Sequence, residues 1–138
     1  MDETEKRNIA RSIGALLGGF VVVVILSVGT DLALHKAGIF PPLGKTMSNP
    51  LFLLATVYRT LYAVVGSYIT ARFAPNRPMQ HALVGGAIGL VLSVVGAVVT
   101  WNKDLGPHWY PLALVATALP CAWVGGKIRL MQLRASRP

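Results

Sequence analysis

Asp31 and Arg59 are the two charged side chains that fall well inside long apolar segments of this 138-residue chain. The other acidic residues lie in the N-terminal tail or in a short polar segment: Asp2, Glu3, Glu5 and Asp104. A charged side chain at the centre of a bilayer costs about 2.5 to 3.5 kcal/mol on insertion scales, so such residues usually face a partner or a site. Asp31 and Arg59 are therefore the residues most able to bind an anion, move a proton or form an ion pair.

Helix geometry makes these two residues plausible partners. Asp31 is expected near the outer edge of its segment, and Arg59 about 14 Å below that edge at about 1.5 Å per residue. Side chains tilt toward the N-terminus of their helix, so the two side chains lean toward each other from antiparallel segments. The remaining gap of several ångströms would be bridged by direct contact, by water or by Tyr58.

Two interpretations of the pair remain open. In the first, Arg59 or a proton-coupled Asp31 forms a polar site in a cavity open to the outer side, lined by Tyr58 and Tyr62. In the second, a neutralised ion pair fixes the first two helices, or Arg59 extends to the lipid headgroups.

His35 lies one helical turn after Asp31 and is a candidate to hold a proton or a metal ion with it, joined by His108 from a different loop. The sequence has no His-x-x-x-His or Cys-x-x-Cys spacing, and its three histidines fall at separate segment ends. We expect neither a metal ion nor another cofactor.

The reactive residues also argue against an enzyme. One intramembrane carboxylate excludes mechanisms that need paired carboxylates, and it excludes carboxylate-rich di-metal sites. Ser67, Ser93 and Cys121 have no histidine at their depth that would act as a base. Cys121 is the only cysteine, so we interpret it as a small packing residue.

Membrane-spanning helices must position these residues. The chain is 54% hydrophobic and 13% charged, against about 25% charged residues in a typical soluble domain. A spanning helix needs roughly 20 apolar residues, and four segments are long enough: 12–34, 50–72, 80–101 and 109–131. We predict an all-α integral membrane protein with one four-helix domain, residues 1–138.

The lysine and arginine residues beside the segments predict the orientation. Nine of them flank the spans on the side of the two termini, and three flank the other side. The termini are therefore expected in the cytoplasm, with the protein in a bacterial plasma (inner) membrane and the lipid bilayer as its surroundings. The net charge of +8 is interpreted as a topology signal, and no nucleic-acid partner is expected.

The chain also resembles two copies of one helical hairpin. The pattern Pro-Leu-x-Leu-x-Ala-Thr occurs at residues 50–56 and again at 111–117. The predicted copies are residues 1–75 and 76–138, related by a pseudo-twofold axis along the membrane normal, as in parallel repeats of some transporters.

Two features of the connections and spans predict local shape. Pro120 lies inside the fourth span and predicts a kink that frees the carbonyl of Ala116 for a partner such as Thr56 or Thr117. The loop 36–49 is apolar and interrupted by proline, so we expect it on the bilayer surface or folded over the mouth of the bundle.

Small residues recur at every fourth position in each span, which favours close helix packing or a homodimer. With few reactive groups and short loops, we expect a structural or regulatory membrane subunit with an unlike partner. The alternative is a homo-oligomeric transporter or channel for a small solute or anion that uses Asp31 and Arg59 near the outer leaflet.

Overall fold

The computed structural model describes residues 1–138 as four α-helices with no strand. The helices are α1 (Glu3–Lys36), α2 (Asn49–Phe73), α3 (Pro78–Thr100) and α4 (Trp109–Ala135). Each is long and apolar enough to cross a membrane. The predicted all-α fold, with four helices able to span a membrane, is thus confirmed.

The helix ends have local causes. Pro50 and Pro78 stand in the first turn of α2 and α3, where the N–H that proline lacks is not needed for a helical hydrogen bond. α1 begins at Glu3, well before the predicted residue 12, because helical hydrogen bonding continues through the polar tail. Its 34 residues extend about 51 Å, which is longer than the roughly 30 Å of a hydrocarbon core.

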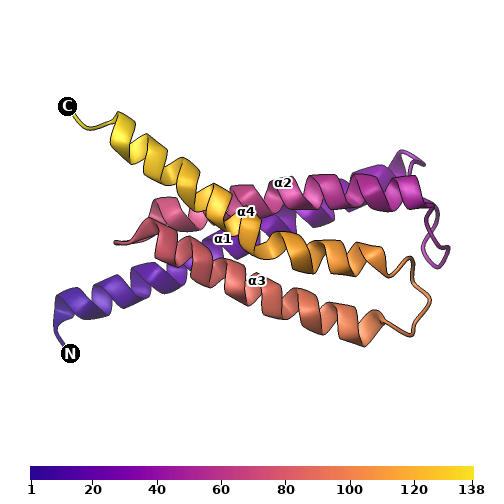
Figure 1. Cartoon of the computed structure of the whole chain (residues 1–138), viewed down its shortest axis with the longest axis horizontal. Coiled ribbons are helices and arrows are strands. Elements are labelled where there is room, and N and C mark those ends of the chain that lie inside the picture. The colour runs from indigo at the N-terminus through magenta and orange to yellow at the C-terminus, as the bar shows by residue number, and fades with distance from the viewer.

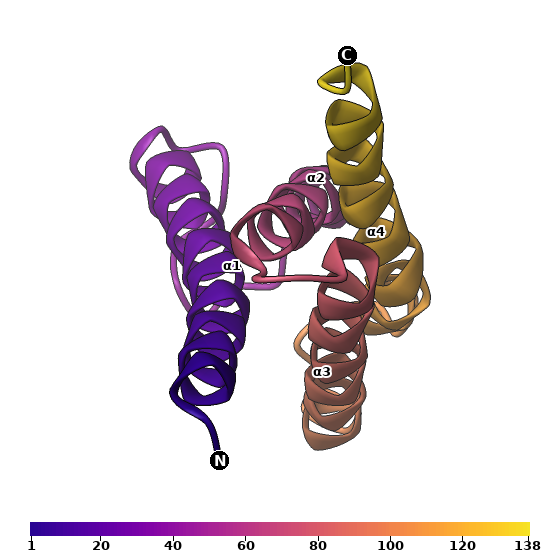
Figure 2. The ribbon, with the colours of Figure 1, turned by 90° about the vertical axis from the view of Figure 1, so that its left-hand side faces the viewer.

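The helices alternate in direction, and both chain termini lie at the same end of the bundle (Figure 1). We call this the terminal end. The two longer connections, residues 37–48 and 101–108, lie at the opposite end, which we call the loop end (Figure 1). α2 lies between α1 and α4, and α1 makes no contact with α4 (Figure 2).

Glycines allow the closest helix contacts. A Cβ atom added to Gly66 of α2 would lie 2.8 Å from the carbonyl oxygen of Gly19 in α1. A Cβ added to Gly125 of α4 would lie 2.7 Å from the carbonyl oxygen of Val64 in α2. Both distances are too short for a side chain, so these glycines let the backbones approach, as expected for helix association in lipid.

α1 and α3 touch only near the terminal end and diverge toward the loop end (Figures 1 and 2). Near the terminal end, His81 Nε2 of α3 lies 2.8 Å from Ser12 Oγ of α1. One turn further along α3, a Cβ added to Gly85 would lie 3.4 Å from the side chain of Leu16. The divergence beyond these contacts opens a cleft, which is described below.

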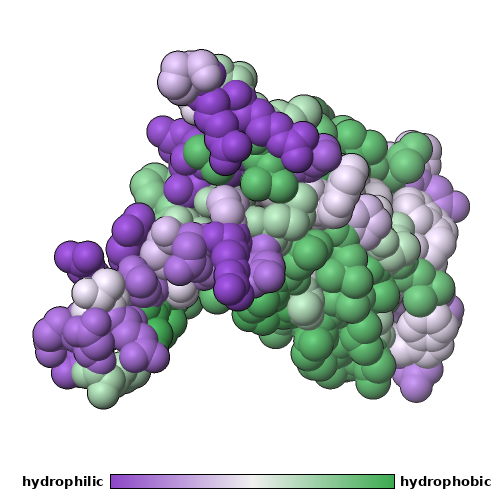
Figure 3. Space-filling model, turned by 60° about the vertical axis from the view of Figure 1, so that its left-hand side comes forward, coloured by the Kyte–Doolittle hydropathy of each residue, from purple (hydrophilic) through white to green (hydrophobic).

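The surface is apolar along the body of the bundle and hydrophilic on the two terminal arms (Figure 3). Only 16 of 138 residues are buried, and large aliphatic side chains of every helix are exposed. Such an apolar surface is far larger than soluble monomers expose, whereas lipid would cover it without cost. Together with the four apolar helices, this indicates an integral membrane protein.

α4 changes direction in its middle, in the part of the helix that contains Pro120 (Figure 1). The bend agrees with the kink predicted from proline inside a helix. The hydroxyls of Thr117 and Thr56, the predicted partners of the freed Ala116 carbonyl, instead donate to Ala113 and Phe52 in their own helices, at 2.9 and 2.8 Å.

Candidate functional site

Asp31 of α1 and Arg59 of α2 form an ion pair, with Arg59 Nη2 2.5 Å from Asp31 Oδ2. The hydroxyl of Tyr58 donates a hydrogen bond to the other carboxylate oxygen, Asp31 Oδ1. Both oxygens of the only carboxylate in the bundle are therefore occupied. The gap of several ångströms expected between the Asp31 and Arg59 side chains is absent, because the two side chains are in direct contact. Tyr58 is a second donor to the Asp31 carboxylate rather than a bridge between the two residues.

A second polar contact joins α1 and α2 beside this ion pair. The hydroxyl of Thr30 donates to the carbonyl of Leu26 at 2.8 Å, so it accepts the hydrogen bond from Tyr62, whose hydroxyl lies 2.7 Å away. The rings of Tyr62 and Tyr58 are 5.8 Å apart. Asp31, Arg59, Tyr58, Tyr62 and Thr30 thus form one polar seam, which we call the α1–α2 polar seam.

His35, the candidate to hold a proton or a metal ion with Asp31, makes its own hydrogen bond outside this seam. Its Nδ1 lies 3.0 Å from the carbonyl of Pro41, and because a carbonyl only accepts, His35 Nδ1 carries the proton. The edge of its ring meets Phe40, at 5.4 Å between centroids. One turn of helix separates His35 from Asp31, but the adjacent loop supplies a nearer acceptor.

The first loop folds over the mouth of α1 and α2, which is one of the two arrangements predicted for it. Phe40 is buried and packs in a core cluster with Ala55 and Tyr58. The loop therefore covers the loop-end side of the polar seam. Phe40 is the buried apolar residue of this loop, whereas Ile39 and Leu43 are exposed.

The remaining histidines make contacts of their own at opposite ends of α3. His108 stacks on Trp101, with ring centroids 4.0 Å apart, and its Nε2 lies 2.9 Å from the Trp101 carbonyl oxygen. His81 contacts Ser12 at the terminal end. No three His, Cys, Asp or Glu side chains come close enough together to hold a metal ion.

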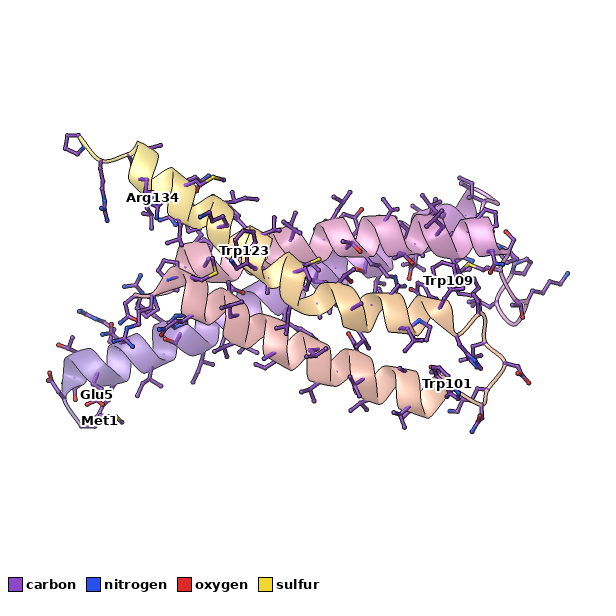
Figure 4. The ribbon with its side chains drawn as sticks, in the orientation of Figure 1. Met1, Glu5, Trp101, Trp109, Trp123 and Arg134 are labelled. Carbon is purple, nitrogen blue, oxygen red and sulfur yellow. The ribbon has the colours of Figure 1, made fainter.

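The tryptophans of the second loop mark the loop end. Trp101 and Trp109 lie there, whereas Glu5 and Arg134 lie at the terminal end (Figure 4). The two rings are only partly exposed, at 37% each. Aromatic residues concentrate at membrane interfaces, so these two positions fit the level of the lipid headgroups.

An interhelical cleft of about 820 Å³ runs between α1 and α3 along one side of the bundle. Its α3 wall includes three small residues, Gly89, Ser93 and Gly96, beside the larger Ile88 and Leu92, and a Cβ added to either glycine would meet no other atom within 4 Å. Arg59 lines the floor of the cleft from α2. The sequence showed the row of small residues, but not that this row is left uncovered.

Arg59 connects the polar seam to the interhelical cleft. Its side chain is 34% exposed, whereas its Nε atom is buried and has no hydrogen-bond partner. A guanidinium has five N–H donors, so Asp31 occupies only part of its capacity. Chemically, the site places one neutralised cation with spare donors beside a cleft whose surface is mostly apolar, with hydroxyl side chains and His108 among the lining residues.

Thr30, Phe40 and the open face of α3 belong to the site but were not singled out from the sequence. Thr30 and Phe40 are common residue types whose roles depend on contacts between elements that the sequence does not specify. Comparison with protein-family models, with curated proteins and with solved structures finds no match to this chain.

Proposed function

We propose that this chain is a structural or regulatory membrane subunit whose interhelical cleft holds a transmembrane helix of an unlike membrane-protein partner. The observation that carries the proposal is the uncovered row of small residues on α3 along the cleft, Gly89, Ser93 and Gly96. Small residues strengthen helix association in lipid because they let two backbones approach.

A helix suits this cleft better than a lipid tail or a polar solute does. Lipid tails gain nothing from glycine, because they pack equally well against larger aliphatic side chains. The cleft lining includes hydroxyl side chains and His108, but its surface is mostly apolar, and its only charged residue, Arg59, is already paired with Asp31. A helix about 10 to 12 Å across would fit one face into a cleft that is open along its side.

The α1–α2 polar seam serves this function by fixing one wall of the cleft. α1 makes no contact with α4 and only limited contact with α3, so its position depends on α2. The Asp31–Arg59 ion pair and the Thr30–Tyr62 hydrogen bond tie the two helices together near the wide part of the cleft.

Purification from native membranes in mild detergent, followed by mass spectrometry of the co-purifying proteins, tests this function. We expect one membrane protein to co-purify in fixed ratio, and we expect Gly89→Leu and Gly96→Leu to release it by filling the cleft. Ala87→Leu is the matched control, because Ala87 is exposed on α3 outside the cleft lining. Retention of the partner by the two glycine variants would contradict the proposal, as would a chain that purifies alone.

A second candidate function is a homo-oligomeric transporter or channel for a small solute or anion. It is favoured by the partly exposed guanidinium of Arg59, the only charged group in the cleft lining, whose ion pair with Asp31 occupies only part of its donors. Liposomes that contain the purified chain test it. Anion flux that falls at least ten-fold in Arg59→Leu would favour the transporter over the subunit.

We also infer that the terminal end faces the cytoplasm of a bacterial cell and that the chain lies in the inner membrane. The inference is supported by the nine basic residues that flank the spans on the side of the termini. Reporter fusions test it: a cytoplasm-active reporter is expected to work at either terminus, and a periplasm-active reporter only in the two connections at the loop end, residues 37–48 and 101–108.

The tandem repeat remains part of the proposal. It is supported by the packing of the helices. A twofold axis would relate the α1–α2 pair to the α3–α4 pair and would pass between α2 and α4, and all three pairs are closely packed. α2 contacts α3, whereas α1 makes no contact with α4, so the two halves differ in how closely they meet. Separate expression of residues 1–75 and 76–138 tests whether each half inserts as a hairpin.

A further inference from the structure

Two arginines at the terminal end approach a neutral tyrosine–glutamine pair that joins α2 and α4. Tyr68 of α2 donates a hydrogen bond to Oε1 of Gln132 in α4, at 2.7 Å. Arg72 Nη1 lies 3.5 Å from the Tyr68 hydroxyl, and Arg129 Nη1 lies 3.4 Å from the same Gln132 oxygen. We call these four residues the terminal-end arginine cluster.

No carboxylate neutralises this cluster. The two ion pairs of the chain are Lys6–Glu3 and Arg59–Asp31, and neither includes a member of the cluster. The remaining acids lie on the N-terminal arm or at the loop end. The N-terminal arm diverges from the C-terminal part of α4, and α1 and α4 are not in contact (Figures 1 and 2).

The chain itself leaves the donors of these guanidiniums largely unused. Both arginine contacts are long for hydrogen bonds, which are normally about 2.9 to 3.0 Å for N–H donors. The Nε atom of Arg129 is buried and has no partner. Arg72 is exposed at the end of α2, so an acceptor from outside reaches it freely.

The cluster also lies at the depth of lipid headgroups. Arg72 is about 34 Å along α2 from its first residue at the loop end, and Arg129 is about 30 Å along α4 from Trp109, at about 1.5 Å per residue. The hydrocarbon core is about 30 Å thick, so both guanidiniums reach the headgroup level opposite Trp109. Tyrosine is itself enriched at this level.

We propose that Arg72 and Arg129 bind the phosphodiester of an anionic phospholipid at the terminal end, in the angle between α2 and α4. Guanidinium matches phosphate oxygens with paired N–H donors, which a lysine ammonium does not do. The Tyr68–Gln132 bond holds α2 and α4 together beneath the bound headgroup. The lipid supplies the negative charge that the chain lacks at this position.

Native mass spectrometry of the full-length protein in mild detergent tests the site, with dioleoyl phosphatidylglycerol and dioleoyl phosphatidylcholine as probes. We expect the phosphatidylglycerol to bind more tightly, and we expect Arg72→Gln and Arg129→Gln each to weaken it about five- to ten-fold. Arg134→Gln is the matched control, because Arg134 is exposed on α4 and takes part in none of the cluster's hydrogen bonds. It removes the same charge and is expected to change binding by less than about two-fold.

A conservative variant separates the site from general charge attraction. Arg129→Lys keeps the charge and removes the paired donors, so it is expected to weaken binding at least about three-fold. Equal loss in Arg134→Gln, unchanged binding in Arg129→Lys, or equal affinity for the two lipids would overturn the proposal. Displacement of the lipid by millimolar glycerol phosphate would also overturn it, since the ligand would then be a soluble phosphate. If Arg129→Gln does not fold, Arg72→Gln still decides, because Arg72 is exposed.

Discussion

Asp31 and Arg59 stand 28 positions apart on α1 and α2 and meet in a direct ion pair of 2.5 Å. Each compensates the other in a part of the chain that is expected to lie in the membrane, where neither would be stable alone. Their side chains are 27% and 34% exposed, so the pair is partly shielded rather than sealed. Its contribution to stability is therefore expected to lie between that of a surface pair and that of a buried one.

Arg59→Leu is expected to lower the free energy of unfolding by about 1 to 3 kcal/mol, because it leaves Asp31 without a cation. Thermal unfolding in detergent micelles measures the change. The double variant Asp31→Asn with Arg59→Gln is expected to lose less than the sum of the two single variants. Unchanged stability, cellular abundance and anion flux in Arg59→Leu would mean that the pair neither stabilises the fold nor forms a site.

Tyr62→Phe is expected to destabilise the contact between α1 and α2 by about 0.5 to 1.5 kcal/mol, the usual contribution of one hydrogen bond. The variant keeps the ring and removes only the hydroxyl that donates to Thr30. Thr56→Val is a suitable control, because the Thr56 hydroxyl bonds within its own helix. Equal effects of the two variants on thermal unfolding in micelles would argue against a specific role for Tyr62.

Gly66→Val is expected to push α1 away from α2, because an added Cβ would meet the Gly19 backbone and the Val23 side chain. Overpacking of this kind costs about 1 to 3 kcal/mol. Gly29→Val adds the same atoms to α1 where no neighbour lies within 4 Å, so it serves as the control. Distances between spin labels on α1 and α2 measure the separation, which is expected to grow only in Gly66→Val.

Phe40→Ala is expected to release the first loop from the mouth of α1 and α2, since Phe40 is the buried residue that anchors it. Amide hydrogen exchange is expected to become faster across residues 39–47. Leu43→Ala removes a side chain of the same loop that is 90% exposed, so its exchange rates are expected to stay unchanged. If Phe40→Ala leaves exchange unchanged, the contacts of His35 with the loop hold it without Phe40.

The number of helices and the approximate position of each span follow from the sequence, because both depend on local properties. A run of apolar residues long enough to cross a bilayer forms a helix there, since every backbone N–H and C=O must be satisfied internally. The contact between Asp31 and Arg59 was also predictable, because lipid leaves so few charged residues to choose from. Pro120 predicted a bend by its chemistry alone.

The tertiary structure decided the contacts that depend on how each helix is rotated and how the helices cross. His35 was a candidate partner of Asp31, and only the folded position of the first loop shows that its Nδ1 meets the Pro41 carbonyl and its ring meets Phe40. Every span carries small residues, yet their spacing does not reveal that Gly66 is packed while Gly89 faces an open cleft. Hydropathy indicates which segments prefer lipid, but helices and lipid tails are equally apolar, so it cannot tell a face that meets a helix from a face that meets lipid.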